Sequence, residues 1–133
     1  MYNHLEMREI DMDTEMATLL ENIKKDYLNW TSVRTALANH GRSELTDINK
    51  SMIAEFNDGL TYKTGSKYIK IITGSAGGGS SVWGFVLNTD NDKKFKKGDI
   101  LKPAGWADPA RNAARGNIID GGYTIRWTGP LYL

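Results

Sequence analysis

The hydrophobic residues in the first part of the chain recur at the spacing of an α-helix. They are separated by one, three or four positions, at Met12, Met16, Leu19, Leu20, Ile23, Tyr27 and Trp30. A stripe of this kind runs along one side of a helix and packs into a core or a subunit interface. Asp11 and Asp13 offer side-chain oxygens that can cap its first turn. We therefore predict a helix that ends near Trp30.

Two further helices are expected before residue 60. Thr31 or Ser32 can cap a second, shorter helix that ends near residue 41. A third begins at residue 46 or 47 and ends at Gly59, the expected C′ residue. Its hydrophobic stripe consists of Ile48, Met52, Ile53 and Phe56. The pattern thus predicts two to three helices within residues 12–58.

The second half of the chain alternates in the manner of β-strands. Residues 68–73 and 81–88 are rich in β-branched and aromatic side chains, and the glycine-rich residues 74–80 connect them as a flexible hairpin loop. A further strand enters at residues 98–102 and ends at Pro103. Gly121 and Gly122 make a tight turn between strands at 117–120 and 123–128. Helices followed by strands predict one α+β domain over residues 1–133, with a mainly antiparallel sheet in residues 66–133.

Charge divides the chain in the same way. Residues 1–60 hold eleven acidic and six basic residues, a net charge of −5, whereas residues 61–133 hold five acidic and eleven basic residues, a net charge of +6. The basic half favours an anionic partner, or the two halves simply attract each other. We expect no membrane span and no signal peptide, and thus a soluble cytoplasmic protein.

Catalytic motifs are missing from the sequence. The chain has no cysteine and two histidines, His4 and His40, and it carries no nucleophile elbow, Walker sequence or metal-binding carboxylate cluster. We therefore expect no catalytic residue, no metal, no cofactor and no enzyme activity.

Two basic segments are candidates for binding an anion. Along residues 123–128, Arg126 shares one strand face with Thr124 and Thr128, an arrangement that suits phosphate or ribose oxygens or, alternatively, a solvated sheet face. If Pro109 opens a helical turn, Arg111 and Arg115 lie on one side of it. Asn112 and Asn117 in the same segment can hydrogen-bond a base. The alternative is that Asp108 and Asp120 pair with both arginines.

Aromatic residues supply candidate stacking surfaces. Trp83, Phe85 and Trp106 can stack on a nucleobase, and Asn88 can hydrogen-bond its edge. Trp83 and Phe85 should share one face of their strand, and core packing is the alternative role for these rings.

The segments SVWGFVLN and KKGDILKPAGWADPARNAARGNIIDGGYTIRWTGPLYL resemble small bacteriophage proteins of the Thoeris anti-defence sponge family, first type, over residues 66–133. The resemblance implies a protein of the host bacterial cytoplasm that sequesters, without cleaving it, a cyclic ADP-ribose isomer made by a TIR-domain defence enzyme. It also implies a homo-oligomer, hexameric in relatives, with pockets between subunits, and in some relatives a separate site for cyclic oligonucleotides. The glycine-rich loop is not typical of the family.

Carried onto this chain, the family pattern assigns phosphate contacts to Arg111, Arg115 and Arg126, stacking to Phe85, the base edge to Asn88 and a phosphate or ribose oxygen to Thr128. The apolar tail, residues 131–133, agrees with burial in an oligomer. A small anionic cyclic nucleotide is thus the expected partner, and nucleic acid is not. The alternatives are a small SH3-like barrel that binds nucleic acid, and a phage interaction protein that binds no small anion.

Overall fold

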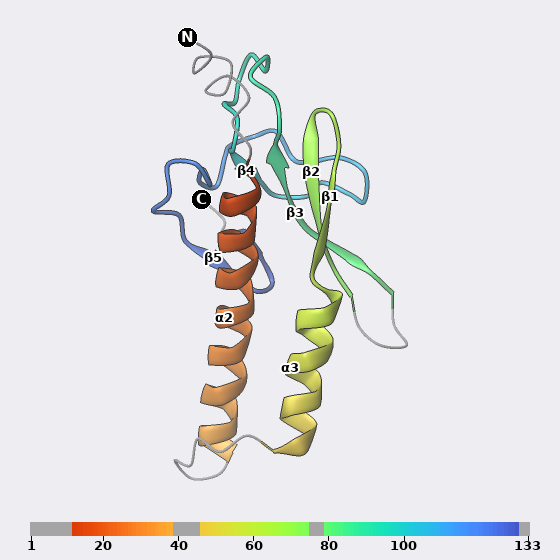
Figure 1. Ribbon diagram of the computed structural model, residues 1–133, viewed down its shortest axis with the longest axis vertical. Helices are drawn as coiled ribbons and strands as arrows, with labels where there is room; N and C mark the ends of the chain where they lie inside the picture. Colours follow the sequence, from red (N-terminus) through yellow and green to blue (C-terminus); the bar gives the residue numbers. More distant parts are fainter. Residues whose placement is uncertain (1–11, 39–45, 75–78, 131–133) are drawn as a thin grey trace.

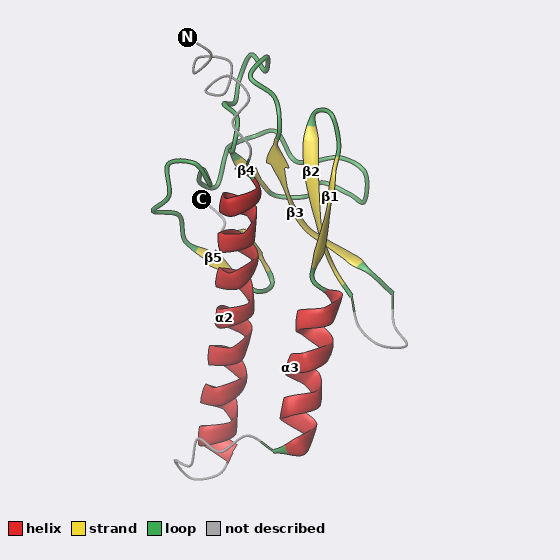
Figure 2. Ribbon diagram, in the orientation of Figure 1, coloured by secondary structure: helices red, strands yellow, loops and turns green. Residues whose placement is uncertain are grey.

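A computed structural model describes residues 12–38, 46–74 and 79–130 and confirms the α+β class (Figure 1). Within these residues, two helices come first, and a four-stranded antiparallel sheet in the order β1-β2-β3-β4 and a two-stranded sheet follow (Figure 2). Their bounds are α2 Asp13–Ala38, α3 Asp47–Gly59, β1 Thr61–Thr64, β2 Tyr68–Thr73, β3 Ser81–Leu87, β4 Ile100–Leu101, β5 Ile125–Arg126 and β6 Gly129–Pro130. The expectations for Asp11, residue 41 and the tail 131–133 lie outside the described residues.

Helix α2 is continuous where the sequence predicted a break. Thr31 does not cap a second helix, because its side chain is buried and its hydroxyl donates to the carbonyl of Tyr27 at 2.9 Å. This bond to the preceding turn satisfies the hydroxyl inside the helix. The predicted stripe is confirmed in α2, where Met16, Leu19 and Ile23 are almost completely buried.

Helix α3 begins as predicted and differs at its end. Thr46 caps it in a capping box, accepting from the amide of Asn49. Gly59 is its last helical residue and not the C′ residue, and the C-cap is Leu60. A Cβ at Gly59 would lie 2.5 Å from the carbonyl oxygen of Gly74, so glycine is required for this close approach.

The apolar stripe of α3 is only partly covered in the described structure. Phe56 is buried, whereas Ile48 is 73% exposed and Met52 is 38% exposed. Core packing is therefore confirmed for Phe56, whereas a subunit interface stays a prediction for Ile48 and Met52.

Strand β3 contains a bulge that reverses the facing of its first residues. Ile71 pairs with Gly84, but Ile72 pairs with Val82, so Trp83 is the extra residue. Trp83 therefore packs with the helices on one face of the sheet, and Phe85 packs on the opposite face. The expectation that these two rings share a face is wrong.

The arginine-rich segment after Pro109 is extended, and the predicted helical turn is wrong. Its backbone runs beside β4, with Ala110 donating to Lys102, Arg115 to Ile100 and Ile118 to Gly98. The sheet edge supplies hydrogen-bond partners that a helical turn would have to supply internally.

The last hairpin lies later in the chain than predicted. Residues 117–120 form a turn, in which the side-chain oxygen of Asn117 accepts from the amides of Ile119 and Asp120. Strands β5 and β6 pair around Trp127 and Thr128, so Gly121 and Gly122 do not form the hairpin turn. The hairpin lies against α2, and Asp26 accepts from the amide of Trp127 at 2.8 Å.

Candidate functional site

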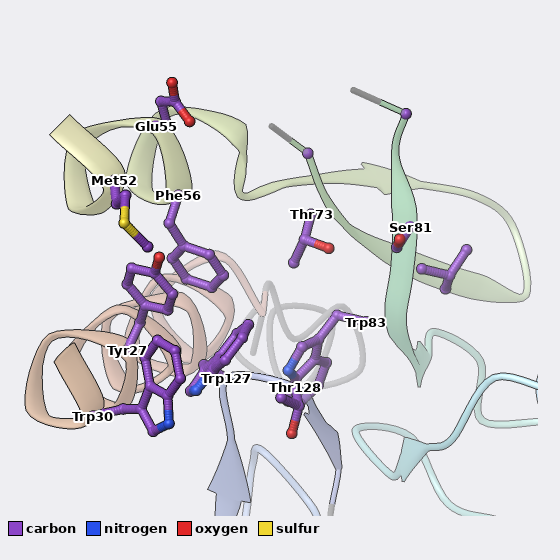
Figure 3. Close-up of a pocket in the computed structure, with 13 residues that line it drawn as sticks. Tyr27, Trp30, Met52, Glu55, Phe56, Thr73, Ser81, Trp83, Trp127 and Thr128 are labelled. Atoms are coloured by element: carbon purple, nitrogen blue, oxygen red, sulfur yellow. The ribbon is translucent and has the colours of Figure 1, made fainter. Parts of the chain in front are cut away.

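The helices, the sheet and the last hairpin enclose an aromatic pocket of about 510 Å³ (Figure 3). This volume falls within the range of small-molecule sites. The five rings that line it are Tyr27, Trp30, Phe56, Trp83 and Trp127. The other described residues of its wall are Met52, Glu55, Thr73, Gly74, Gly79, Ser81, Val82 and Thr128. We refer to it as the aromatic pocket.

Four of the rings hold one another in place. Tyr27 stacks on Phe56 with a centroid distance of 4.2 Å. Trp127 meets Tyr27 edge-on at 4.9 Å and lies tilted against Trp30 at 5.0 Å. Such contacts fix ring orientation and each contribute about 0.5–1.5 kcal/mol beyond area burial. The helix side of the pocket is thus a preformed wall.

The fifth ring faces this wall from the sheet (Figure 3). The indole nitrogen of Trp83 donates to the carbonyl of Arg126 at 2.8 Å, which fixes its ring against the hairpin. Trp83 is 2% exposed, so the ring surface open to a planar ligand comes mainly from the half-buried Trp30 of α2 and Trp127 of the hairpin.

Polar groups are few and come from different elements. Thr73 ends β2, Ser81 begins β3, and Thr128 lies in the turn between β5 and β6. Each hydroxyl can donate or accept a hydrogen bond, which suits a ribose or the edge of a base. Glu55, exposed at the rim, adds one carboxylate acceptor.

Tyr27 can also serve as a donor. Burial, and after it the negative charge of Glu55, raises the pKa of the Tyr27 hydroxyl above its ordinary value. This shift favours the protonated hydroxyl, which is the form that can donate a hydrogen bond.

The residues predicted to bind phosphate are not brought together. Arg111 donates to both oxygens of Asp92 at 2.8 Å and to the hydroxyl of Tyr68 at 2.8 Å. This pairing raises the pKa of the Arg111 guanidinium and holds the pKa of Asp92 well below its usual range, through hydrogen bonds from Arg111 and from two backbone amides. Arg111 is thus paired within the fold, with Asp92 as its partner in place of Asp108 or Asp120.

The other predicted arginines lie apart from it. Arg115 donates to the carbonyl of Ala113 and to the side chain of Asn112. Arg126 is exposed on the hairpin, and its carbonyl accepts from the indole of Trp83. Asp120 pairs with Lys96 and with neither arginine. The alternation predicted around Arg126 is confirmed, because Tyr123, Ile125 and Trp127 are half-buried while Thr124, Arg126 and Thr128 are exposed.

Three of the residues predicted to contact a base, Phe85, Asn88 and Asn117, have structural roles. Phe85 is 1% exposed in the small core on the outer face of the four-stranded sheet, which is the face opposite the helices. Its ring therefore has no free surface for stacking. Asn88 donates to the carbonyl of Gly65, and Asn117 donates to Asp99 and the carbonyl of Lys97. Trp106 is 54% exposed, on the outer face. Of the predicted ligand-binding residues, Thr128 lines the aromatic pocket.

Acidic and histidine side chains do not gather into a metal site in the described ranges 12–38, 46–74 and 79–130. Neither described helix has a stretch long and apolar enough to cross a membrane.

The fold and the pocket together define the class, an α+β protein with a preformed aromatic site on the helix side of its sheet. A family model matches residues 3–131, and the chain belongs to that family, described as a family of unknown function (DUF7717). No curated protein and no solved structure is detectably similar to the chain. The ligand expected from the resemblance to sponge proteins stays a prediction.

Proposed function

We propose that the chain binds a small nucleotide in the aromatic pocket and holds it without cleaving it. The observation that carries this proposal is a pocket of about 510 Å³ whose described lining holds five aromatic rings and three serine or threonine hydroxyls. Base stacking on an aromatic ring contributes about 1–3 kcal/mol per base, and hydroxyls are suited to ribose oxygens. In this proposal the base stacks on Trp127, whose ring is only half-buried, and the ribose contacts Thr73, Ser81 and Thr128.

The ligand class comes from the sequence resemblance. It is a cyclic ADP-ribose-type signal made by a bacterial TIR-domain enzyme, captured in the host cytoplasm by a homo-oligomer of this chain. Sequestration needs affinity and no turnover. The described lining of the pocket is consistent with that, because it holds a single carboxylate, Glu55, and no histidine. Glycoside hydrolysis ordinarily uses two carboxylates, and hydrolysis at phosphorus often uses a metal ion.

The phosphates of such a ligand would lie toward the rim. No lysine or arginine is among the described residues that line the pocket. Arg34 lies over the ring of Trp30, 4.8 Å from its centroid, and is the cation we place nearest a bound phosphate. We therefore revise the expected phosphate contacts from Arg111, Arg115 and Arg126 to Arg34, and expect affinity to depend weakly on salt.

Isothermal titration calorimetry with cyclic ADP-ribose, linear ADP-ribose and adenosine tests the site. Thr128→Val removes one pocket hydroxyl and should weaken binding about 2- to 12-fold, the equivalent of a hydrogen bond of about 0.5–1.5 kcal/mol. Thr124→Val, an exposed threonine on the same hairpin, is the matched control and should leave binding unchanged. Equal affinities for wild type and both variants would place the ligand elsewhere.

A further inference from the structure

The outer face of the sheet, opposite the helices, carries two lysines side by side. Lys63 of β1 and Lys70 of β2 are directly paired in the antiparallel ladder, so their side chains lie on the same face. Neither forms an ion pair with a carboxylate in the described part of the chain. Like charges placed directly opposite each other destabilise a sheet, and a bound anion would relieve that repulsion.

An exposed tryptophan adjoins these lysines. The ammonium of Lys70 lies 4.5 Å from the centroid of the Trp106 ring, and Trp106 is 54% exposed. Lys70 occupies one side of the indole, and the exposed remainder is available for stacking. The ring stands on a loop closed by a bridge between Pro103 and Pro109, so its position is defined.

The basic surface continues along β2. Tyr68 lies two positions before Lys70 on the same face and contacts Arg111. Beside it is a polar groove of about 570 Å³ whose charged residues are Lys67, Lys93, Arg111 and Asp92. Asp92 forms ion pairs with both Arg111, at 2.8 Å, and Lys67, at 3.8 Å, and three cations against this one carboxylate leave the groove with an excess of positive charge. Asp108 is exposed on the same loop as Trp106 and is the acidic residue nearest to that tryptophan in the sequence.

We propose that this outer face, defined by Lys63, Lys70 and Trp106 and extended by the groove at Lys67, binds single-stranded nucleic acid. An open row of cations beside an exposed ring matches an extended polyanion with stackable bases, which is how sequence-tolerant single-strand binding works. A base stacks on Trp106 while the backbone phosphates lie against Lys70 and Lys63. The sequence did not indicate nucleic acid as a partner, because Lys63 and Lys70 are separated along the chain. Only the pairing of β1 with β2 brings these two lysines side by side. This surface is independent of the aromatic pocket, which lies on the other side of the sheet.

Fluorescence anisotropy with labelled oligothymidylate of about 15 nucleotides tests the proposal, since one binding module covers about 4–16 nucleotides. Trp106→Ala should weaken binding about 5- to 150-fold, corresponding to about 1–3 kcal/mol per stacked base. Lys63→Gln with Lys70→Gln should weaken it and flatten the slope of log K against log salt by about 1.4, for two lost phosphate contacts. Lys50→Gln, an exposed lysine of α3, is the control and should bind as wild type.

Thermal unfolding checks that each variant folds as wild type does. The proposal is overturned if no binding occurs at about 50 mM salt, where electrostatic binding is strong, or if the Trp106 and lysine variants bind as tightly as the control. It is also overturned if polyglutamate, which has no bases, binds equally well and shows the same sensitivity to Trp106→Ala. Because Thr128→Val should leave oligonucleotide binding unchanged, failure here is distinguishable from failure of the aromatic pocket.

Discussion

The two faces of the four-stranded sheet use the same kinds of side chain in different ways. On the helix side, Trp83 is 2% exposed and its indole nitrogen is hydrogen-bonded, and the pocket it lines is walled by rings that contact one another. On the outer side, Phe85 and Leu101 form a small core under the loops, while Lys63, Lys70 and Trp106 are left partly open to solvent. One face thus has an aromatic pocket lined by mutually packed rings, and the other has a basic surface with an exposed tryptophan.

This difference shows how burial determines what an aromatic ring can do. A ring locked by neighbours contributes to stability and presents a fixed surface to a ligand. A ring held only by a loop and one ammonium contributes little to stability and remains accessible. The predictions below separate the two cases.

The largest expected effect is on the helix side. Trp127→Ala removes contacts with Tyr27, Trp30 and Phe56 and should lower the free energy of unfolding by about 2–3 kcal/mol, below the usual range for a fully buried tryptophan because Trp127 is half-buried. Trp106→Ala should change it by no more than about 0.5 kcal/mol. Urea denaturation of both variants measures the contrast, and equal losses would show that the faces do not differ as described.

The junction between α3 and the glycine-rich loop comes next. Gly59→Ala places a Cβ 2.5 Å from the carbonyl oxygen of Gly74, which should cost about 1–2 kcal/mol after the higher helix propensity of alanine is allowed for. Gly105→Ala, on the outer loop, meets no atom within 4 Å and is the matched control. Urea denaturation again gives the comparison. A stabilised Gly59→Ala protein would contradict the close approach.

Removal of the cap of α3 should have a smaller effect. Thr46→Ala leaves the amide of Asn49 without its acceptor and should cost about 1 kcal/mol in the same measurement. Ser51→Ala, at an exposed position in the same helix, should be neutral or slightly stabilising. A neutral result at Thr46 would mean that the capping box does not support the helix.

The last prediction concerns Asp92, on the outer face, and applies only at acidic pH. Hydrogen bonds from Arg111 and two amides hold the pKa of Asp92 low, so the ionised Asp92 carboxylate stabilises the folded state. This contribution to the free energy of unfolding is fully present above the pKa of an unfolded aspartate, about 4. It is lost as the pH falls from there toward the lower pKa of the folded state. Thermal unfolding of Asp92→Asn below pH 4 should therefore vary less with pH than that of wild type. Parallel curves would show that Asp92 does not contribute this dependence.

Much of the fold could be predicted from local patterns. The buried stripe of α2, the cap at Thr46 and the hairpin of β2 and β3 follow from spacing and propensity, and they are present. The continuation of α2 through Thr31 could not be predicted, because it depends on a bond between the hydroxyl and a carbonyl one turn back. The bulge at Trp83 likewise depends on the partner strand.

The site was harder to predict than the fold. The aromatic pocket joins residues as far apart as Tyr27 and Thr128, and in the sequence Tyr27, Trp30 and Phe56 look like ordinary core residues. The available signals were Trp83 as a candidate stacking ring, Thr128 as a candidate ligand contact, and the alternation of residues 123–128, which put Trp127 on one strand face with Tyr123 and Ile125. Arg111 looked free to bind an anion because Asp92, its partner, is 19 residues away in a lysine-rich turn.

Sequestration of an intact nucleotide is tested most directly by loading and recovery. The protein is incubated with cyclic ADP-ribose, washed by ultrafiltration and heated to unfold it, and the released small molecules are quantified by mass spectrometry. Our account predicts retention by wild type, weaker retention by Thr128→Val, and recovery of the ligand unchanged in the amount retained. Linear ADP-ribose in place of the cyclic form, or no retention by wild type, would contradict it.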